Sequence, residues 1–300
     1  MSERKPWHGV IVATTLPFKD DLSVDYDAYG EHVQFLAANG CHGVAPNGSL
    51  GEYQTLSDEE RARVVETAVA AAPEGFAVMP GVGAYGGLQT EKWANQAAEA
   101  GAQAVMLLPP NTYRANDDEV VEHFRLAAKA GLPVVGYNNP IDTKVDLTPE
   151  LIARIHNEGN MVGVKEFSGD VRRAYAIKEL SPQMDILIGT DDTLLETGLA
   201  GAVGWVAGYT NAIPQTTVEL FNLSTSGKAE DLLKAREIYT DLHSLLRWDT
   251  KTEFVQAIKL SMDIYGLKGG PTRPPRGPLA DWMRKGITAD TEAALAKGYK

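Results

Sequence analysis

Short runs of apolar, β-forming residues alternate with amphipathic stretches along most of the chain, and this alternation constrains the fold more than any other feature. Strand interiors that are apolar almost throughout are typical of a parallel sheet that helices cover on the outside. We therefore predict a (β/α)8 TIM barrel, with a doubly wound open sheet as the alternative. The predicted strands are Gly9–Ala13, Gly43–Pro46, Phe76–Val82, Ala104–Pro109, Pro133–Asn138, Met161–Glu166, Asp185–Gly189 and Ala202–Gly208.

The stretches between these strands carry helix start and stop signals. Ser57-Asp58-Glu59-Glu60 is a capping box, and Thr148-Pro149 places proline in the first turn of a helix. Glycine follows several helices, at Gly40, Gly101 and Gly131. The predicted helices are Asp25–Asn39, Ser57–Ala72, Leu88–Ala100, Asp118–Ala130, Thr148–Glu158 and Val171–Leu180.

After Ile213 the alternation stops and longer helical stretches follow. A segment rich in proline and glycine, from Gly266 to Pro278, precedes a last helix that we place around Leu279–Lys285. No linker composition separates this part from the rest, so we expect a barrel over residues 1–212 with a packed helical extension over residues 213–300. The longer helices are predicted at Gln215–Ser226, Ala229–Arg247 and Thr252–Tyr265.

Composition narrows the classes of partner. The 300 residues carry a net charge of −12, which argues against binding to nucleic acid or to an anionic membrane surface. Cys41 is the single cysteine, so an internal disulfide is excluded. The charged stretch from Met1 to Trp7 is unlike a signal peptide, and no apolar run reaches membrane-spanning length, so we expect a cytoplasmic protein.

Lys165 stands where a buried strand meets the active face of the predicted barrel. The preceding residues, 161–164, are apolar, and a lysine beside them is costly to bury as a cation. Burial depresses the pKa of an amine, which makes lysine a nucleophile that can form an imine with a carbonyl compound. The structural alternative is a lysine that extends from the strand end toward solvent.

Other strand ends carry polar groups that would meet Lys165 at the same face of a barrel. In the loop Asn47–Glu52 the glycines free the backbone to present amides to an anion, and Ser49 adds a hydroxyl. Tyr137 lies at the end of the fifth strand and Asn139 directly after it, and Asp191-Asp192 follows the seventh. Each group has a structural alternative, such as a tight turn, a strand aromatic or a helix cap, but their convergence indicates an active site.

The sequence gives little support for a dinucleotide cofactor or for a metal. The segment Gly81–Gly86 matches a dinucleotide-binding fingerprint, but the next strand ends without the acidic residue that would hold a ribose. The histidines show no metal-ligand spacing, which argues against a metal-dependent aldolase. They are His8, His32, His42, His123, His156 and His243.

The ordered motifs 48–52 (Gly-Ser-Leu-Gly-Glu), 137–140 (Tyr-Asn-Asn-Pro) and 163–166 (Gly-Val-Lys-Glu) resemble the dihydrodipicolinate synthase/N-acetylneuraminate lyase family. The resemblance spans nearly the whole chain. It implies a class I mechanism on 2-keto acids without metal or cofactor, in a homotetramer built as a dimer of dimers. Lys165 would form the imine and Tyr137 would relay protons, while Ser49 and the Leu50 amide would hold the substrate carboxylate. Further substrate-binding residues implied by the resemblance are Gly48, Asn139, Thr112, Tyr113 and Val206.

Departures from the synthase pattern bear on the substrate. The synthases have two threonines where this chain has Ser49-Leu50, and usually an arginine where it has Asp142, which would repel the aldehyde partner's carboxylate. The tyrosine that synthases donate across a dimer is displaced or absent near Thr112-Tyr113. We therefore predict a catabolic lyase or hydro-lyase of the 2-keto-3-deoxy sugar-acid aldolase or dehydratase type. The alternatives are a pyrroline-4-hydroxy-2-carboxylate deaminase of hydroxyproline catabolism, a dihydrodipicolinate synthase and a non-catalytic keto-acid-binding protein.

Overall fold

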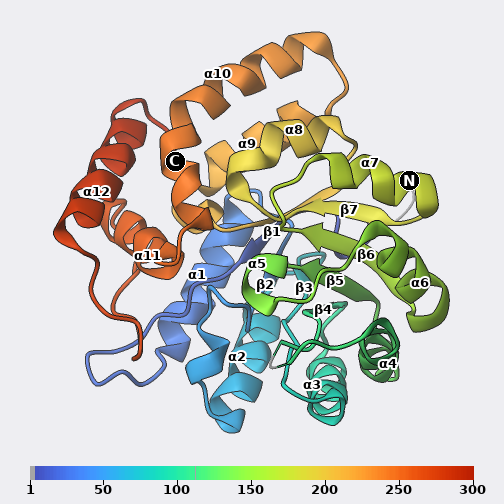
Figure 1. The fold of residues 1–300 in the computed structure, drawn as a ribbon. Helices are drawn as coiled ribbons and strands as arrows, with labels where there is room; N and C mark the ends of the chain where they lie inside the picture. Colours follow the sequence, from blue (N-terminus) through green and yellow to red (C-terminus); the bar gives the residue numbers. More distant parts are fainter. Residues whose placement is uncertain (1–3, 112) are drawn as a thin grey trace.

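A computed structural model describes residues 4–111 and 113–300 and shows a barrel of parallel strands inside a ring of helices (Figure 1). The strand order is β3-β2-β1-β8-β7-β6-β5-β4, and a parallel bridge between Gly81 and Met106 joins the two edges. The predicted (β/α)8 barrel is thus confirmed. The strands are β1 (Gly9–Ala13), β2 (Gly43–Ala45), β3 (Ala77–Val78), β4 (Val105–Leu107), β5 (Val134–Asn138), β6 (Met161–Glu166), β7 (Asp185–Ile188) and β8 (Gly204–Ala207).

The third strand differs most from its predicted bounds. Regular pairing in β3 stops at Val78, because Pro80 has no N–H to donate to a neighbouring strand. The chain nevertheless stays alongside β4: the Pro80 carbonyl accepts from Met106 N, and Val82 N donates to the Met106 carbonyl, both at 2.9 Å. The barrel is therefore closed by the irregular residues 79–82, where we predicted that a regular strand would run to Val82.

The helices on the outside follow the predicted signals. Ser57 and Glu60 form the capping box of α2, and the Thr148 side chain accepts from Leu151 N at the start of α6. The helices between β1 and β8 are α1 (Tyr26–Ala38), α2 (Asp58–Ala71), α3 (Gly87–Ala100), α4 (Asp117–Ala128), α5 (Pro140–Thr143), α6 (Pro149–Gly159), α7 (Arg172–Leu180) and α8 (Leu194–Leu199). No helix in the described ranges is both long and apolar enough to cross a membrane.

The C-terminal helices are α9 (Pro214–Thr225), α10 (Ala229–Leu246), α11 (Phe254–Ile264) and α12 (Asp281–Ala296). α9 packs against α8, as the eighth helix of a barrel would, and α10 to α12 lie beside the barrel (Figure 1). The division at residue 213 stays a prediction.

The predicted end of the last helix is wrong. We placed the helix around Leu279–Lys285, but α12 continues through Gly286 to Ala296. A Cβ at Gly286 would lie 3.1 Å from the Trp248 ring, so glycine lets this helix pack closely against that side chain.

Candidate active site

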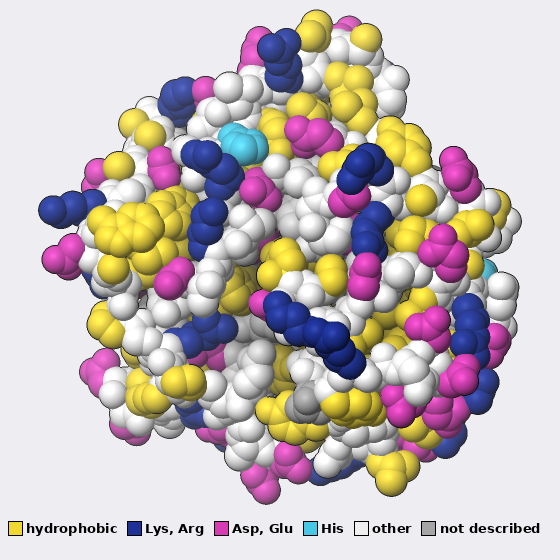
Figure 2. All heavy atoms as spheres, in the orientation of Figure 1, with side chains coloured by type: hydrophobic (Ala, Val, Ile, Leu, Met, Phe, Trp, Pro, Cys, Tyr) yellow, Lys and Arg dark blue, Asp and Glu magenta, His cyan; other side chains and the backbone are white. Residues whose placement is uncertain are grey.

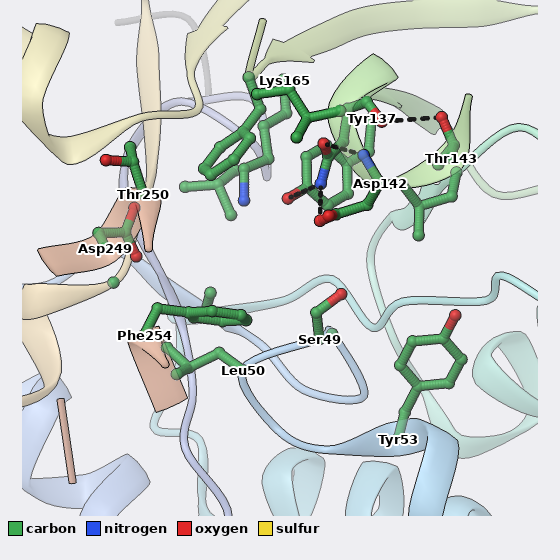
Figure 3. Close-up of a pocket in the computed structure, with 18 of the residues that line it drawn as sticks. Ser49, Leu50, Tyr53, Tyr137, Asp142, Thr143, Lys165, Asp249, Thr250 and Phe254 are labelled. Atoms are coloured by element: carbon green, nitrogen blue, oxygen red, sulfur yellow. Dashed lines mark hydrogen bonds between the residues drawn. The ribbon is translucent and has the colours of Figure 1, made fainter. Parts of the chain in front are cut away.

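A cavity of about 330 Å³ lies where the carboxyl ends of the strands meet the C-terminal helices. Lys165 and Tyr137 lie on one wall, with Ser49 and Leu50 opposite them (Figure 3). The face around this mouth mixes acidic and basic side chains without a broad patch of either sign (Figure 2). Besides these four, the lining includes Gly48, Tyr53, Asn139, Asp142, Thr143, Phe167, Val206, Gly208, Asp249, Thr250, Phe254 and Arg276.

The pairing of β5 with β6 places Tyr137 beside Lys165. The Lys165 side chain is only 6% exposed, and its Nζ lies 4.1 Å from the centroid of the Tyr137 ring. Burial lowers the pKa of Lys165 to about 8, although the charges of Asp249 and Asp191 act in the opposite direction. Roughly a tenth of such amines is unprotonated at pH 7, which favours nucleophilic attack.

The Tyr137 phenol is buried and stays protonated at neutral pH. Burial, followed by the charge of Asp249, raises the pKa of this phenol. Its oxygen accepts a hydrogen bond from Asn139 Nδ2 at 3.4 Å, and its ring meets Phe167 edge to face with centroids 6.0 Å apart. A protonated phenol beside a reactive amine can give up a proton and take it back within one reaction cycle.

The loop after β2 lines the cavity with Gly48, Ser49 and Leu50. The left-handed residues are Asn47 (φ 57°) and Glu52 (φ 54°), whereas Gly48 and Gly51 have no positive φ. The left-handed turns of this loop therefore lie at its first and last residues and not at its glycines. Among the described residues, the amides of Ser49 and Leu50 donate to no backbone carbonyl.

Two buried acids, Asp191 and Asp249, lie close enough to Lys165 for their charges to act on it. Asp191 follows β7 and accepts hydrogen bonds from Trp205 Nε1 (3.0 Å), Gly208 N (3.1 Å) and Tyr209 N (2.7 Å), which fixes the loop after β8. Burial raises the pKa of Asp191 to about 6, although these hydrogen bonds oppose the change. A helix cap was the structural alternative for Asp191, and its carboxylate instead binds the end of β8.

Asp249 reaches the cavity from the turn between α10 and α11. Burial and then the charge of Asp191 raise the pKa of this carboxyl well above its ordinary value. A Cβ at Gly208 would lie 2.3 Å from Asp249 Oδ1, so the acid can approach the strand end only because residue 208 is glycine. The charges of Asp191 and Asp249 favour the protonated form of Lys165, and the charge of Lys165 in turn opposes the rise in the pKa of Asp249.

The cavity contains most of the substrate-binding residues that we predicted from sequence. Gly48, Ser49, Leu50, Asn139 and Val206 line it with Lys165 and Tyr137.

One predicted substrate-binding residue, Tyr113, does not line the cavity. Tyr113 is 52% exposed and lies in a separate hollow with Tyr85 and His123, while Thr112 lies outside the described residues. Lys144, two residues beyond Asp142, is not part of the cavity lining, and its amino group donates to the Ile141 carbonyl.

The glycines of the dinucleotide-like segment serve packing. A Cβ at Gly81 would lie 2.4 Å from the Asn47 carbonyl oxygen. The buried Arg61 guanidinium donates to the carbonyls of Gly81 and Gly83, at 3.1 and 2.9 Å. Within the described part of the chain, no group of three or more His, Cys, Asp or Glu side chains is arranged to hold a metal.

Several residues that line the cavity were not predicted from the sequence. Tyr53 follows the loop after β2, while Asp249, Phe254 and Arg276 come from the C-terminal part. Tyr53 could have been suspected from its place directly after the Gly-Ser-Leu-Gly-Glu loop. The other three carry no local pattern that points to the barrel mouth.

Comparison with known proteins agrees with this geometry. The family described as "Dihydrodipicolinate synthetase family" matches residues 6–294. The chain belongs to this family. Its members are class I aldolase-type lyases, and so is this enzyme.

Named relatives include both synthases and lyases. A 4-hydroxy-tetrahydrodipicolinate synthase of Methanothrix thermoacetophila is 34% identical and covers 92% of each chain. An uncharacterized DapA-like lyase of Halobacterium salinarum is 31% identical and covers 94% of this chain and 92% of its own. The crystal structure of dihydrodipicolinate synthase from Aquifex aeolicus has a TM-score of 0.89, with 26% identity over 98% of both chains.

Proposed function

We propose that this enzyme is a Schiff-base-forming lyase or hydro-lyase of the 2-keto-3-deoxy sugar-acid aldolase or dehydratase type. The observation that carries the proposal is the buried amine of Lys165, which faces the cavity with a lowered pKa beside the Tyr137 phenol. The free amides of Ser49 and Leu50 across the cavity suit the carboxylate of a 2-keto acid.

The proposed cycle begins when the Lys165 amine attacks C2 of the keto acid. Loss of water gives a protonated imine, which withdraws electrons from the bonds at C3. Removal of a C3 proton then gives an enamine that expels the C4 hydroxyl as water, with one proton supplied by an acid. In the aldolase variant the C4 hydroxyl of the protonated imine loses its proton and the C3–C4 bond breaks, which gives an aldehyde and an enamine. A proton added at C3 of this enamine restores the imine. Tyr137 moves these protons, and hydrolysis of the imine restores Lys165.

The pH dependence of imine formation follows from the pKa of Lys165. Only the unprotonated amine attacks, so the initial rate is expected to rise about tenfold per pH unit below pH 8 and level off above it. Samples mixed with pyruvate, quenched with borohydride at set times and read by intact mass give this rate. A rate that keeps rising toward pH 10.5, the value of an ordinary lysine, would contradict the assignment.

Tyr137→Phe is expected to keep the fold and lower turnover roughly 10²- to 10⁴-fold, the usual effect of losing a positioned proton donor. The phenyl ring still packs under the Lys165 amine, so pyruvate trapping should persist. The matched control is Tyr175→Phe, which removes an exposed phenol from α7 and should leave turnover unchanged. Near-full activity of Tyr137→Phe on the true substrate would exclude a proton relay at this position.

A substrate panel distinguishes the candidate functions. Asp142 lines the cavity where the synthases usually place an arginine, and its carboxylate accepts from Asn139 Nδ2 at 2.8 Å. We therefore expect poor condensation of pyruvate with aspartate semialdehyde, because like charges in a partly desolvated pocket repel. Release of pyruvate from a 2-keto-3-deoxy sugar acid, or formation of its dehydrated product, would support the proposal.

Other results from the same panel select the alternatives. Robust condensation would assign the synthase activity that the names of several relatives carry. Ammonia released from pyrroline-4-hydroxy-2-carboxylate would assign the deaminase. Binding of keto acids without turnover of any compound would assign a binding protein.

A further inference from the structure

Arg276 brings a guanidinium to the cavity from the segment between α11 and α12. It lines the same cavity as Lys165 and is partly buried. Its Cζ lies 5.3 Å from the centroid of the Phe254 ring, and its Nη1 donates to the Thr252 carbonyl at 3.5 Å. Both contacts are with the C-terminal wall of the cavity, so the side chain belongs to that wall.

No ion pair among the described residues includes Arg276, so none of their carboxylate oxygens lies within 4.0 Å of its guanidinium nitrogens. Arg273, three residues earlier, is paired with Glu60 at 2.6 Å, and Glu52 is paired with Lys259 at 3.0 Å. Burial lowers the pKa of Arg276, and the charges of Glu52 and Asp142 act against this change. The guanidinium remains ionised, because an arginine pKa far above neutrality tolerates such a decrease.

The segment that carries Arg276 is anchored on the barrel. The Arg273 guanidinium donates to the carbonyls of Leu22 and Thr55 as well as to Glu60. Its backbone N–H donates to Glu52 Oε2 at 3.0 Å, and Lys259 Nζ donates to the Pro271 carbonyl at 2.7 Å. These contacts fix the approach of Arg276 to the cavity.

We propose that Arg276 binds a carboxylate at the end of the substrate remote from C2, so that the enzyme prefers 2-keto diacids to 2-keto monoacids. The proposal rests on the proposed function, in which the first carboxylate lies at Ser49 and Leu50. A guanidinium with no protein carboxylate can bind a ligand carboxylate through two parallel hydrogen bonds. It replaces, from another part of the chain, the arginine that the synthases usually have at the position of Asp142.

Asp142 lines the same cavity and refines the substrate class. Its carboxylate repels a second anion but accepts a hydrogen bond from a hydroxyl group. A hydroxylated 2-keto diacid, with its far carboxylate on Arg276 and a hydroxyl near Asp142, therefore suits the charges of this cavity.

The test compares two probes that differ in the far carboxylate, 2-oxoadipate and 2-oxohexanoate. The half-saturating concentration for borohydride trapping is measured for each with the purified full-length protein. We expect 2-oxoadipate to half-saturate the wild type at a concentration roughly ten- to a hundredfold lower, the effect of one hydrogen-bonded charge pair. Arg276→Gln should bring this ratio close to one, and Arg276→Lys should retain part of it.

The matched control is Arg284→Gln, which removes an exposed guanidinium from the neighbouring hollow that Arg276 also borders. This variant should retain the wild-type ratio. Lys251 is an exposed cation that also lines the cavity. The proposal is overturned if the wild type shows no preference, if Arg276→Gln keeps the preference, or if Lys251→Gln rather than Arg276→Gln removes it.

A second readout separates this proposal from the proposed function. If neither probe nor pyruvate is trapped, imine formation fails, and calorimetry then compares the unreactive 2-hydroxyadipate with 2-hydroxyhexanoate. Tighter binding of the diacid that Arg276→Gln abolishes supports the carboxylate site on its own. Equal binding of the two hydroxy acids overturns it.

Discussion

Replacement of Lys165 by alanine is expected to abolish covalent trapping of pyruvate and to reduce turnover of the true substrate to the uncatalysed level. The reason is chemical, because without the amine no imine forms and the electrons of the bond to be broken have no acceptor. In the wild type, borohydride should add one pyruvate-derived mass, which peptide mapping locates at Lys165. Both the covalent adduct and the turnover thus depend on one nitrogen atom.

Two variants accompany this substitution. Lys165→Met keeps the side-chain volume and should show the same loss, which separates chemistry from a packing defect. Lys178→Ala removes a lysine whose amino group donates to the Pro182 carbonyl at the surface, and it should trap pyruvate like the wild type. Trapping that survives in a folded Lys165→Ala variant would refute the imine at this residue.

The barrel could be predicted because its strands are short apolar runs bounded by glycine or polar residues. β1 and β6 have the predicted bounds, and the register of β5 against β6 brings together the two residues that the motifs singled out, Tyr137 and Lys165. The prediction used local periodicity, which is strongest where a strand is buried on both faces.

The C-terminal wall of the site could not be predicted in the same way. Asp249 and Arg276 lie more than 80 residues beyond Lys165, and they reach the cavity only because α10 to α12 pack beside the barrel. Asp249 also needs the missing side chain of Gly208, a contact between two distant segments. Such contacts depend on tertiary packing, and no spacing along the chain encodes them.

The buried pair of Lys259 and Glu52 joins this wall to the loop after β2. Lys259 Nζ lies 3.0 Å from Glu52 Oε1, and the two side chains are 2% and 0% exposed. The same carboxylate accepts from Arg273 N, and the same ammonium donates to the Pro271 carbonyl. The pair thus holds both the cavity loop that ends at Glu52 and the segment that carries Arg276.

Lys259→Met is expected to lower the free energy of unfolding by about 3–5 kcal/mol, because it leaves the Glu52 carboxylate buried without its partner. Guanidinium titration followed by circular dichroism measures this loss.

The double variant Glu52→Gln/Lys259→Met removes the buried charge and should recover more than half of the lost free energy of unfolding, since glutamine still accepts from Arg273 N. The matched control is Lys92→Met, which breaks an exposed pair with Asp58 (57% and 67% exposed) and should cost less than about 1 kcal/mol. A cost for Lys259→Met no larger than that of Lys92→Met would show that this buried pair does not hold the C-terminal helices on the barrel.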